Sequence, residues 1–458
     1  MFLPISAMSD KSIRRQAVEG VFITSAGSVL AKILGLFATF FVLTHLTTYD
    51  YGLWRLLLSV VSFFGLISLG SISGILVADI SRELGAGRSG AAQAILRRAL
   101  GYFCLMGLFS AGALCIAAPV ISSISGIGLT TMLLILAVTL LIGGLRQAMQ
   151  VAFQARLEPT YAQVMDLIGA VGYIVLLVIF LGVFDYGILG LVLAYTLSTT
   201  FGTLALLPFL FRPRDAQKAV EADQVYSFKE AMWRRGKWAF AEDYVQTAAS
   251  SAWPWIVGYF LSISQVGIIS IAVVLVGQVT ALVPVQYVLR SILPRFTADR
   301  ERIGEWLIRA MRYALWGQVL VGVGVLIIAY VVFPSFFPSY LAALPLYLLL
   351  LVAIPFRSGT SVLTEWYYAR KAQKAFFMVN AISKLSFIFL PFLLVWLGLS
   401  GFAVWFLIDS VLSYGISLWY VTTREELSYK LHHLVLPDSA DGLFIRDGMR
   451  FVKSKFRS

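Results

Sequence analysis

Long apolar segments recur along the whole sequence and limit what the chain can fold into. Runs of roughly 18 or more residues with almost no charged side chain alternate with short polar stretches. Each run can cross the ~30 Å hydrocarbon core of a bilayer as a helix. The composition agrees, since 59% of the residues are hydrophobic and 13% are charged. The sequence therefore predicts an all-α polytopic membrane protein, and it lacks the short alternating strands typical of a membrane β-barrel.

The longest polar run, Arg212 to Lys237, lies near the middle and separates two sets of apolar segments. We expect twelve transmembrane helices in two pseudo-symmetric six-helix bundles. The expected spans cover residues 17–44, 52–80, 100–118, 129–153, 164–184, 187–211, 238–261, 267–288, 306–333, 341–362, 376–397 and 401–420. The predicted domains are an N-terminal bundle (1–211), a cytoplasmic linker (212–237), a C-terminal bundle (238–421) and a basic amphipathic cytoplasmic tail (422–458). A solvated, disordered tail is the alternative for that last segment.

The two halves resemble each other at one offset. Arg98–Tyr102 opens an apolar segment after a basic loop, and Arg309–Tyr313 does the same 211 positions later. Arg146 and Arg357, late in the fourth and tenth spans, are separated by the same 211 positions. We interpret these matches as an internal duplication, and repeated halves around a shared cavity are typical of secondary transporters. Two further matches need three more residues of offset: Asp166 with Asn380, and Gly187 with Gly401.

Basic residues outside the spans lie on one side of the predicted membrane. They occur in both termini, in the central linker and in the loops that follow even-numbered spans, whereas the opposite loops carry none. By the positive-inside rule, both termini and the linker are expected in the cytoplasm. The net charge of +12 is therefore mainly a topology signal, and nucleic-acid binding is not predicted.

Several ionisable residues fall inside the predicted spans, where charge is costly and usually faces a wet cavity or a partner. The basic ones are candidates for binding an anionic substrate in a central cationic cavity, and the acidic ones for proton or ion coupling. Two alternatives remain: Arg146, Arg357 and Lys384 reach the cytoplasmic headgroups, or a pair such as Lys32 with Asp243 is structural. The basic candidates are Lys32, Arg55, Arg146, Arg357 and Lys384; the acidic candidates are Asp409, Glu242 and Asp243.

An anionic cargo fits this excess of bases. A diphosphate cannot enter hydrocarbon alone, because its desolvation is too costly, whereas arginine in a wet cavity can bind phosphate through two hydrogen bonds. The sequence shows no nucleophile–base pair and no metal-ligand spacing, so neither a catalytic site nor a cofactor is predicted. Cys104 and Cys115 are read as small core residues.

Motifs in the first hundred residues carry a family resemblance. They are Gly20 and Gly27, Tyr51-Gly52-Leu53-Trp54 with Ser59, Leu69-Gly70, and the stretch ISRELGAGRSGAAQAILRRAL from Ile80 to Leu100. In these features the chain resembles the polysaccharide transporters (Wzx-type O-antigen flippases) of the multidrug/oligosaccharidyl-lipid/polysaccharide exporter superfamily. Members often carry an acid just before the Leu-Gly pair, where this chain has Ser68.

The resemblance implies a V-shaped pair of six-helix bundles around a cationic cavity. The implied activity is flipping of polyprenyl-diphosphate-linked oligosaccharide (O-antigen, capsule or exopolysaccharide units) across the bacterial cytoplasmic (inner) membrane. Alternating access and proton antiport are the implied mechanism. The implied partners are the lipid-linked glycan and membrane lipid, with a polysaccharide polymerase and a chain-length regulator as candidate protein partners. Twelve spans favour this branch over the peptidoglycan-precursor flippases, which typically have fourteen.

Two other functions compete with this interpretation. A cation-coupled multidrug exporter of the same fold is expected to have a cavity rich in acids and aromatic residues, but bases outnumber acids in these spans. A membrane polysaccharide polymerase or ligase needs external loops that hold acceptor sugars and catalytic side chains. The predicted external loops are only a few residues long, and the histidine among them is His45. The sequence therefore favours a transporter over an enzyme.

Overall fold

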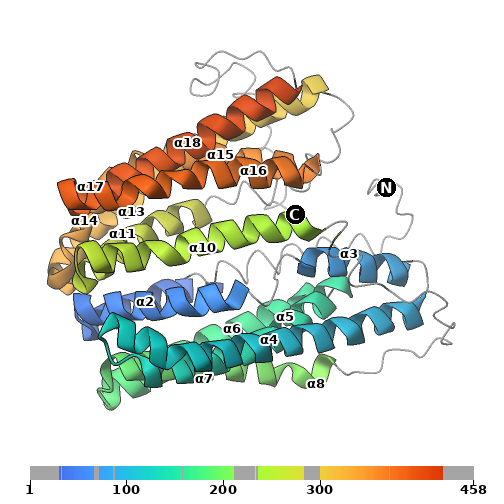
Figure 1. The fold of residues 1–458 in the computed structure, drawn as a ribbon, viewed down its shortest axis with the longest axis horizontal. Coiled ribbons are helices and arrows are strands. Elements are labelled where there is room, and N and C mark those ends of the chain that lie inside the picture. Colours follow the sequence, from blue (N-terminus) through green and yellow to red (C-terminus); the bar gives the residue numbers. More distant parts are fainter. Residues whose placement is uncertain are drawn as a thin grey trace, which may run out of the picture. The chain divides into compact units, whose positions relative to one another are not determined.

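The structure is a computed structural model that describes residues 30–31, 33–66, 72–85, 88–156, 158–210, 233, 236–282, 300–370 and 372–425. Within these ranges the regular secondary structure is entirely helical (Figure 1). The contacts between helices divide the chain into two compact units, one ending at Ile268 and the other starting at Ile269.

The described part of the first unit consists mainly of long helices. A short apolar helix, Ile33–His45, precedes them. The labelled elements are α2 (Thr48–Gly65), α3 (Ile72–Gly85), α4 (Ser89–Ser125), α5 (Thr130–Ala155), α6 (Pro159–Leu177) with the π-helical η3 (Val178–Val183), α7 (Gly187–Ala205), α8 (Leu207–Leu210), α10 (Lys237–Phe260) and the first residues of α11 (Ile263–Leu282).

Local sequence explains where α2 begins. Thr47 and Asp50 form a reciprocal capping box, in which each side chain accepts a hydrogen bond from the other residue's backbone amide. Two otherwise unpaired amides of the first turn are thereby satisfied. The cap fixes the start of α2 after the turn at residues 46–47.

Glycine lets α2 approach α11 at backbone distance. A Cβ atom on Gly52 would lie 1.9 Å from the Ile263 carbonyl oxygen, and one on Gly267 would lie 2.1 Å from the Thr48 carbonyl oxygen. The two glycines therefore face each other's helices across a contact that admits no side chain. On the same helix, Ser59 accepts a 2.8 Å hydrogen bond from the Trp255 indole of α10. Gly52 and Ser59 of the family motif are thus packing residues.

The second unit contains α13 (Arg300–Phe336), α14 (Ala343–Leu351), α15 (Ile354–Ala369), α16 (Gln373–Ser383), α17 (Leu390–Leu397) and α18 (Leu399–Glu425), with the 3₁₀ segments η6 (Pro338–Tyr340) and η7 (Lys384–Phe389). A hydrophobic core joins α13, α15, α16 and α18 near their basic ends; its largest buried side chains are Trp366 and Tyr367. α14 and α15 meet at an angle of 56°. Pro355, in the first turn of α15, lacks the amide needed to continue α14.

The structure confirms the predicted class of protein, a helical membrane protein with several spans. Of the described helices, eight are long and apolar enough to cross a membrane, or nine if the bent pair of α14 and α15 is one span. Each of the twelve predicted spans contains at least part of a described helix. Helices α4 and α13 are longer than the spans expected there, because each also includes a basic stretch before its apolar segment.

The structure supports the internal duplication and corrects one match in it. Helices α4 and α13 each contain 37 residues, and both bounds of α13 lie 211 positions after those of α4. Gly187 and Gly398, also 211 apart, adopt φ values of 54° and 58° directly before or at the start of the last long helix in their halves. The same offset therefore extends to these helices. Gly187 corresponds to Gly398, and its expected match with Gly401 was wrong.

Candidate functional site

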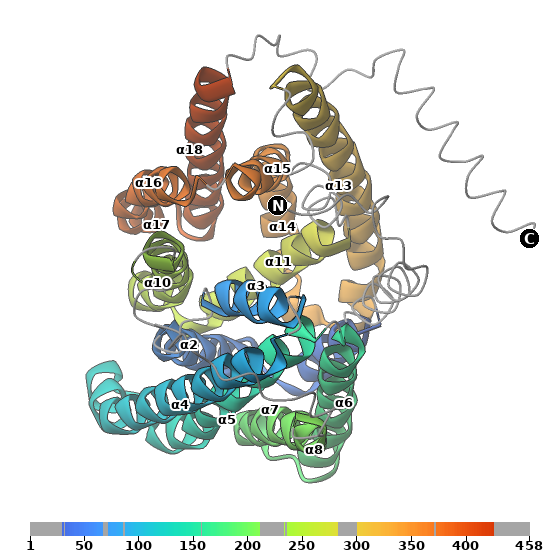
Figure 2. The ribbon, with the colours of Figure 1, turned by 90° about the vertical axis from the view of Figure 1, so that its right-hand side faces the viewer.

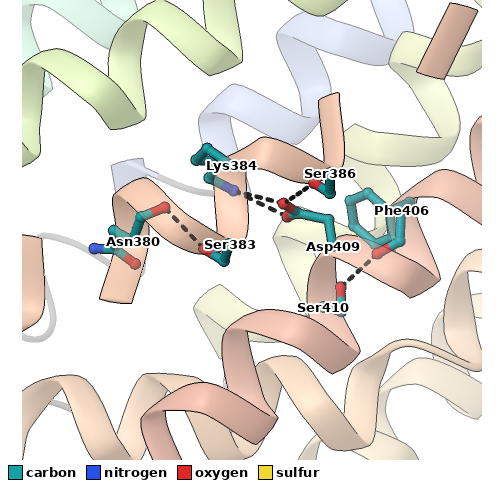
Figure 3. A network of polar contacts seen from close by, with 7 residues as sticks. All are labelled: Asn380, Ser383, Lys384, Ser386, Phe406, Asp409 and Ser410. Atoms are coloured by element: carbon teal, nitrogen blue, oxygen red, sulfur yellow. Dashed lines mark hydrogen bonds and ion pairs between the residues drawn. The ribbon is translucent and has the colours of Figure 1, made fainter. Parts of the chain in front are cut away.

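An ion pair in the second unit joins two of the predicted candidates. Lys384, the first residue of η7, places its Nζ atom 2.9 Å and 3.1 Å from the two carboxylate oxygens of Asp409 in α18. Ser386 donates a further hydrogen bond of 2.9 Å to Oδ1 of Asp409 (Figure 3). The Asp409 side chain is buried, with only 7% of its surface exposed. Three donated hydrogen bonds thus compensate a carboxylate that has lost most of its water.

The break between α16 and α17 explains why the lysine lies where it does. Pro391, in the first turn of α17, has no amide hydrogen, and its ring would clash with a carbonyl one turn earlier in a continuous helix. The chain therefore follows a 3₁₀ path over residues 384–389. Lys384 and Ser386 both lie on this segment and both reach Asp409 (Figure 3).

Arg357 in α15 is placed differently. Its guanidinium lies over the Phe406 ring, 4.5 Å from the ring centroid, and is also within range of the Asp409 charge. It forms no salt bridge with any residue that the structure describes. A cation–π contact compensates only part of the lost hydration of a guanidinium. Arg357 therefore has no carboxylate bonded to it among the described residues, and an anionic ligand could pair with it.

In the first unit, Arg146 of α5 forms an ion pair with Asp166 of α6. Both side chains are partly exposed, at 26% and 34% of their surface. The Arg146 charge also acts on Tyr195 of α7. The Tyr195 ring contacts Trp54 of α2, with centroids 5.4 Å apart, and Tyr173 of α6, at 6.3 Å. Helices α2, α5, α6 and α7 thus bring a basic residue and an aromatic cluster together.

Arg55 is the second basic candidate that the structure places in the first unit. It lies one turn after Tyr51 in α2, and its Nε atom is buried without a hydrogen-bond partner. It forms no salt bridge with the described part of the chain. Among the four basic candidates that the structure describes, each unit therefore has one paired with a carboxylate and one without a salt bridge to the described residues: Arg146 and Arg55 in the first, Lys384 and Arg357 in the second.

The remaining candidates are the two acidic residues of α10 and Lys32. Glu242 is buried in α10, Asp243 is half-buried beside it, and both have interaction partners. Lys32 lies outside the described residues, and so does the suggested pair of Lys32 with Asp243. In the part of the chain that is described, no three His, Cys, Asp or Glu side chains are arranged to hold a metal ion.

Sequence reasoning missed both ion pairs. It treated Lys384 as a substrate ligand and Asp409 as a coupling acid, whereas the structure joins them. It used Asp166 only as a repeat marker, although Asp166 is the partner of Arg146. A usable signal existed for that second pair, because Arg146 and Asp166 lie at similar distances on either side of the turn at residues 156–158. Two antiparallel helices therefore bring them to similar depth.

A duplicated, all-helical membrane chain with compensated and uncompensated charges inside its spans is typical of a secondary transporter. Solved structures of transporters share this fold. An inward-facing multidrug resistance MATE family transporter of the MOP superfamily aligns with a TM-score of 0.71 at 14% identity, over 88% of this chain and 98% of its own. The lipid II flippase MurJ, in an inward closed conformation, aligns with a TM-score of 0.65 at 16% identity, over 90% of this chain and 89% of its own.

A third similar structure is a MOP superfamily transporter from Pyrococcus furiosus whose binding pocket is described as having reverse polarity. It aligns with a TM-score of 0.60 at 14% identity, over 90% of this chain and 95% of its own. At these identities the comparisons define the fold, which is that of the MOP superfamily. No curated protein sequence matches the chain significantly.

Sequence comparison then identifies the family. Residues 42–340, more than half of the chain, match the profile of the family described as polysaccharide biosynthesis protein. The chain belongs to this family, and it is a multi-pass membrane protein with the MOP-superfamily fold. The predicted family and fold class are confirmed. The V-shaped arrangement and the shared central cavity remain predictions.

Proposed function

We propose that the chain translocates polyprenyl-diphosphate-linked oligosaccharide units across the bacterial cytoplasmic membrane, as in O-antigen or capsule assembly, by alternating access. The polysaccharide biosynthesis family supports a glycan substrate, and a lipid II flippase is among the proteins with a similar fold. The observation that carries the proposal is the pair of span arginines, Arg55 and Arg357, that form no salt bridge with the described residues. Each unit thus contributes a fixed positive charge at membrane depth that is suited to binding a phosphate group.

The membrane potential favours this direction of transport. With the cytoplasm negative, outward movement of each negative charge is favourable by roughly 2.3 kcal/mol per 100 mV. The harder step is release, because a cation that binds phosphate well also retains it. The Lys384–Asp409 pair offers a way to weaken binding, since Asp409 and an incoming phosphate compete for the same ammonium group. In this scheme Asp409 is the residue that couples transport to proton movement. Lys384 binds the phosphate when Asp409 is protonated, and it pairs with Asp409 again when the proton leaves.

The test is a flipping assay with purified protein in proteoliposomes. A polyprenyl-diphosphate oligosaccharide with a fluorescent sugar is placed in both leaflets, and an impermeant quencher reports the fraction that crosses. We expect the wild-type chain to make the inner pool accessible within minutes. Arg357→Ala and Arg55→Ala should reduce the initial rate at least tenfold, whereas Arg357→Lys should retain part of it, because a charge remains but the bidentate grip is lost.

Arg88→Gln is the matched control. It removes an exposed cation paired with Glu83 outside the apolar segment of α4, and the rate should stay at the wild-type value. Full flipping by both alanine variants would exclude the proposed roles of the arginines. Absence of flipping by the wild-type chain, together with resistance to organic cations in cells that express it, would instead favour the multidrug exporter.

A further inference from the structure

A groove lies within the second unit, between α15, α16 and α18. It has a volume of 1080 Å³, and Figure 2 shows these three helices next to one another. The groove is separate from the ion pair described above, since neither Lys384 nor Asp409 lines it. Its lining is mainly apolar and includes Met378, Ile382 and Trp419. These three side chains are exposed over 51%, 51% and 67% of their surface.

The floor of the groove is firmly packed. Trp366 and Val379 line it and are almost fully buried in the hydrophobic core that joins α13, α15, α16 and α18. The exposed apolar side chains above this floor would contact lipid tails in a membrane. The groove is therefore a fixed depression that suits an acyl chain.

Three cations surround one end of the groove. Arg370 follows the last turn of α15, Lys374 lies in the first turn of α16, and Arg424 lies in the last turn of α18. None of the described lining residues is acidic. The positive-inside rule assigns this end to the cytoplasmic side, where the leaflet is rich in anionic lipid.

The start of α16 adds further hydrogen-bond donors at the same end. Its N-cap is Ala372, which has no side chain able to cap the helix. Ala372, Lys374 and Ala375 of this first turn all line the groove. The positive end of the helix dipole favours an oxyanion at such a helix start.

We propose that this groove binds an anionic phospholipid of the cytoplasmic leaflet, with its phosphate among Arg370, Lys374 and Arg424 and an acyl chain along Met378 and Ile382. Basic pockets between helices at the cytoplasmic surface are suited to anionic headgroups. The apolar floor continues directly from the cationic end, which matches the order of headgroup and chain in a phospholipid. This site would hold α15, α16 and α18 together at their basic ends.

Contact-dependent quenching tests the proposal. In the full-length chain, Cys104 and Cys115 are replaced by alanine, and Met378→Cys is labelled with a small fluorophore. The protein is reconstituted into phosphatidylcholine vesicles that contain a minor fraction of either phosphatidylglycerol or phosphatidylcholine with brominated acyl chains. We expect brominated phosphatidylglycerol to quench the fluorophore about ten times more effectively per mole than brominated phosphatidylcholine does. This preference is smaller than the maximum expected if each of three surface cations fully attracts an anionic headgroup.

The preference should disappear in the variant Arg370→Gln/Lys374→Gln/Arg424→Gln. It should persist in the control variant Arg97→Gln/Arg98→Gln, which removes two exposed charges at the basic end of α4. A label at Leu320→Cys, an exposed position on α13, should be quenched equally by both lipids in every variant and thereby reports correct reconstitution.

Three outcomes would overturn the proposal. Equal quenching by both lipids at position 378 would make the groove part of the general lipid-facing surface. Persistence of the preference in the triple variant would exclude the three cations as the headgroup site. Quenching that appears only after removal of residues 426–458 would mean that the chain's own tail occupies the groove.

Discussion

At the scale of single residues, the candidate cations inside the spans have similar surroundings in the two units. Among the described candidate cations, each unit has one that pairs with a carboxylate on a neighbouring helix and one arginine that forms no salt bridge with the described residues. A buried pair adds little net stability compared with an apolar replacement, but breaking it leaves a buried charge without compensation. The Lys384–Asp409 pair is more buried than the Arg146–Asp166 pair. The unfolding free energies of its single and double variants should therefore differ more.

We predict that Lys384→Met lowers the free energy of unfolding by about 3–5 kcal/mol, because Asp409 loses its counter-charge. Asp409→Asn should cost less, because the amide still accepts the hydrogen bond from Ser386. The double variant Lys384→Met/Asp409→Asn should be more stable than Lys384→Met alone. Thermal unfolding in detergent measures all three. Strictly additive losses would indicate that the two side chains are not coupled in the folded protein.

Asp409→Asn also tests the role of the pair in release. With the carboxylate charge removed, Lys384 no longer has a competitor for phosphate. In the flipping assay this variant should therefore bind the lipid-linked substrate more tightly and turn over more slowly than the wild-type chain. Faster turnover at unchanged affinity would contradict the proposed competition.

At the scale of secondary-structure elements, a contact between α2 and α11 in the first unit depends on small residues. Helix α2 approaches the start of α11 so closely that Gly52 has no room for a methyl group. We predict that Gly52→Ala lowers the unfolding free energy by about 1–3 kcal/mol, because the helices must separate. Gly101→Ala in α4 is the matched control: its Cβ meets no atom within 4 Å, so it should be neutral or slightly stabilising. Equal melting temperatures for both variants would contradict the close contact.

The same scale shows how far sequence reasoning could reach. Apolar run length predicted the helical spans, and repeated arginines predicted the 211-residue offset that α4 and α13 follow. Arg146 and Asp166 could have been paired from their similar distances to one turn. Lys384 and Asp409 could not be paired in this way, because the 3₁₀ segment η7 lies between Lys384 and the following α-helix, α17. The rise and the rotation per residue in η7 differ from those of an α-helix. Register across such a break depends on tertiary packing.

At the scale of the whole molecule, the charge distribution and the duplication make one joint prediction about orientation. An even number of spans in each half gives the two halves the same orientation, so α4 and α13 should both begin on the basic, cytoplasmic side. The two helices have the same length at the expected offset. Their far ends, near Ser123 and Phe336, should therefore both face outward.

Single cysteines in a background without Cys104 and Cys115 test this orientation. Gln93→Cys and Ser123→Cys both lie at exposed positions of α4, about 45 Å apart along the helix axis. An impermeant maleimide added to intact cells without an outer membrane should label Ser123→Cys at once and Gln93→Cys only after permeabilisation. Phe336→Cys at the end of α13 should behave like Ser123→Cys. The reverse pattern would place the basic loops outside, and opposite behaviour of positions 123 and 336 would mean that the halves are inverted repeats.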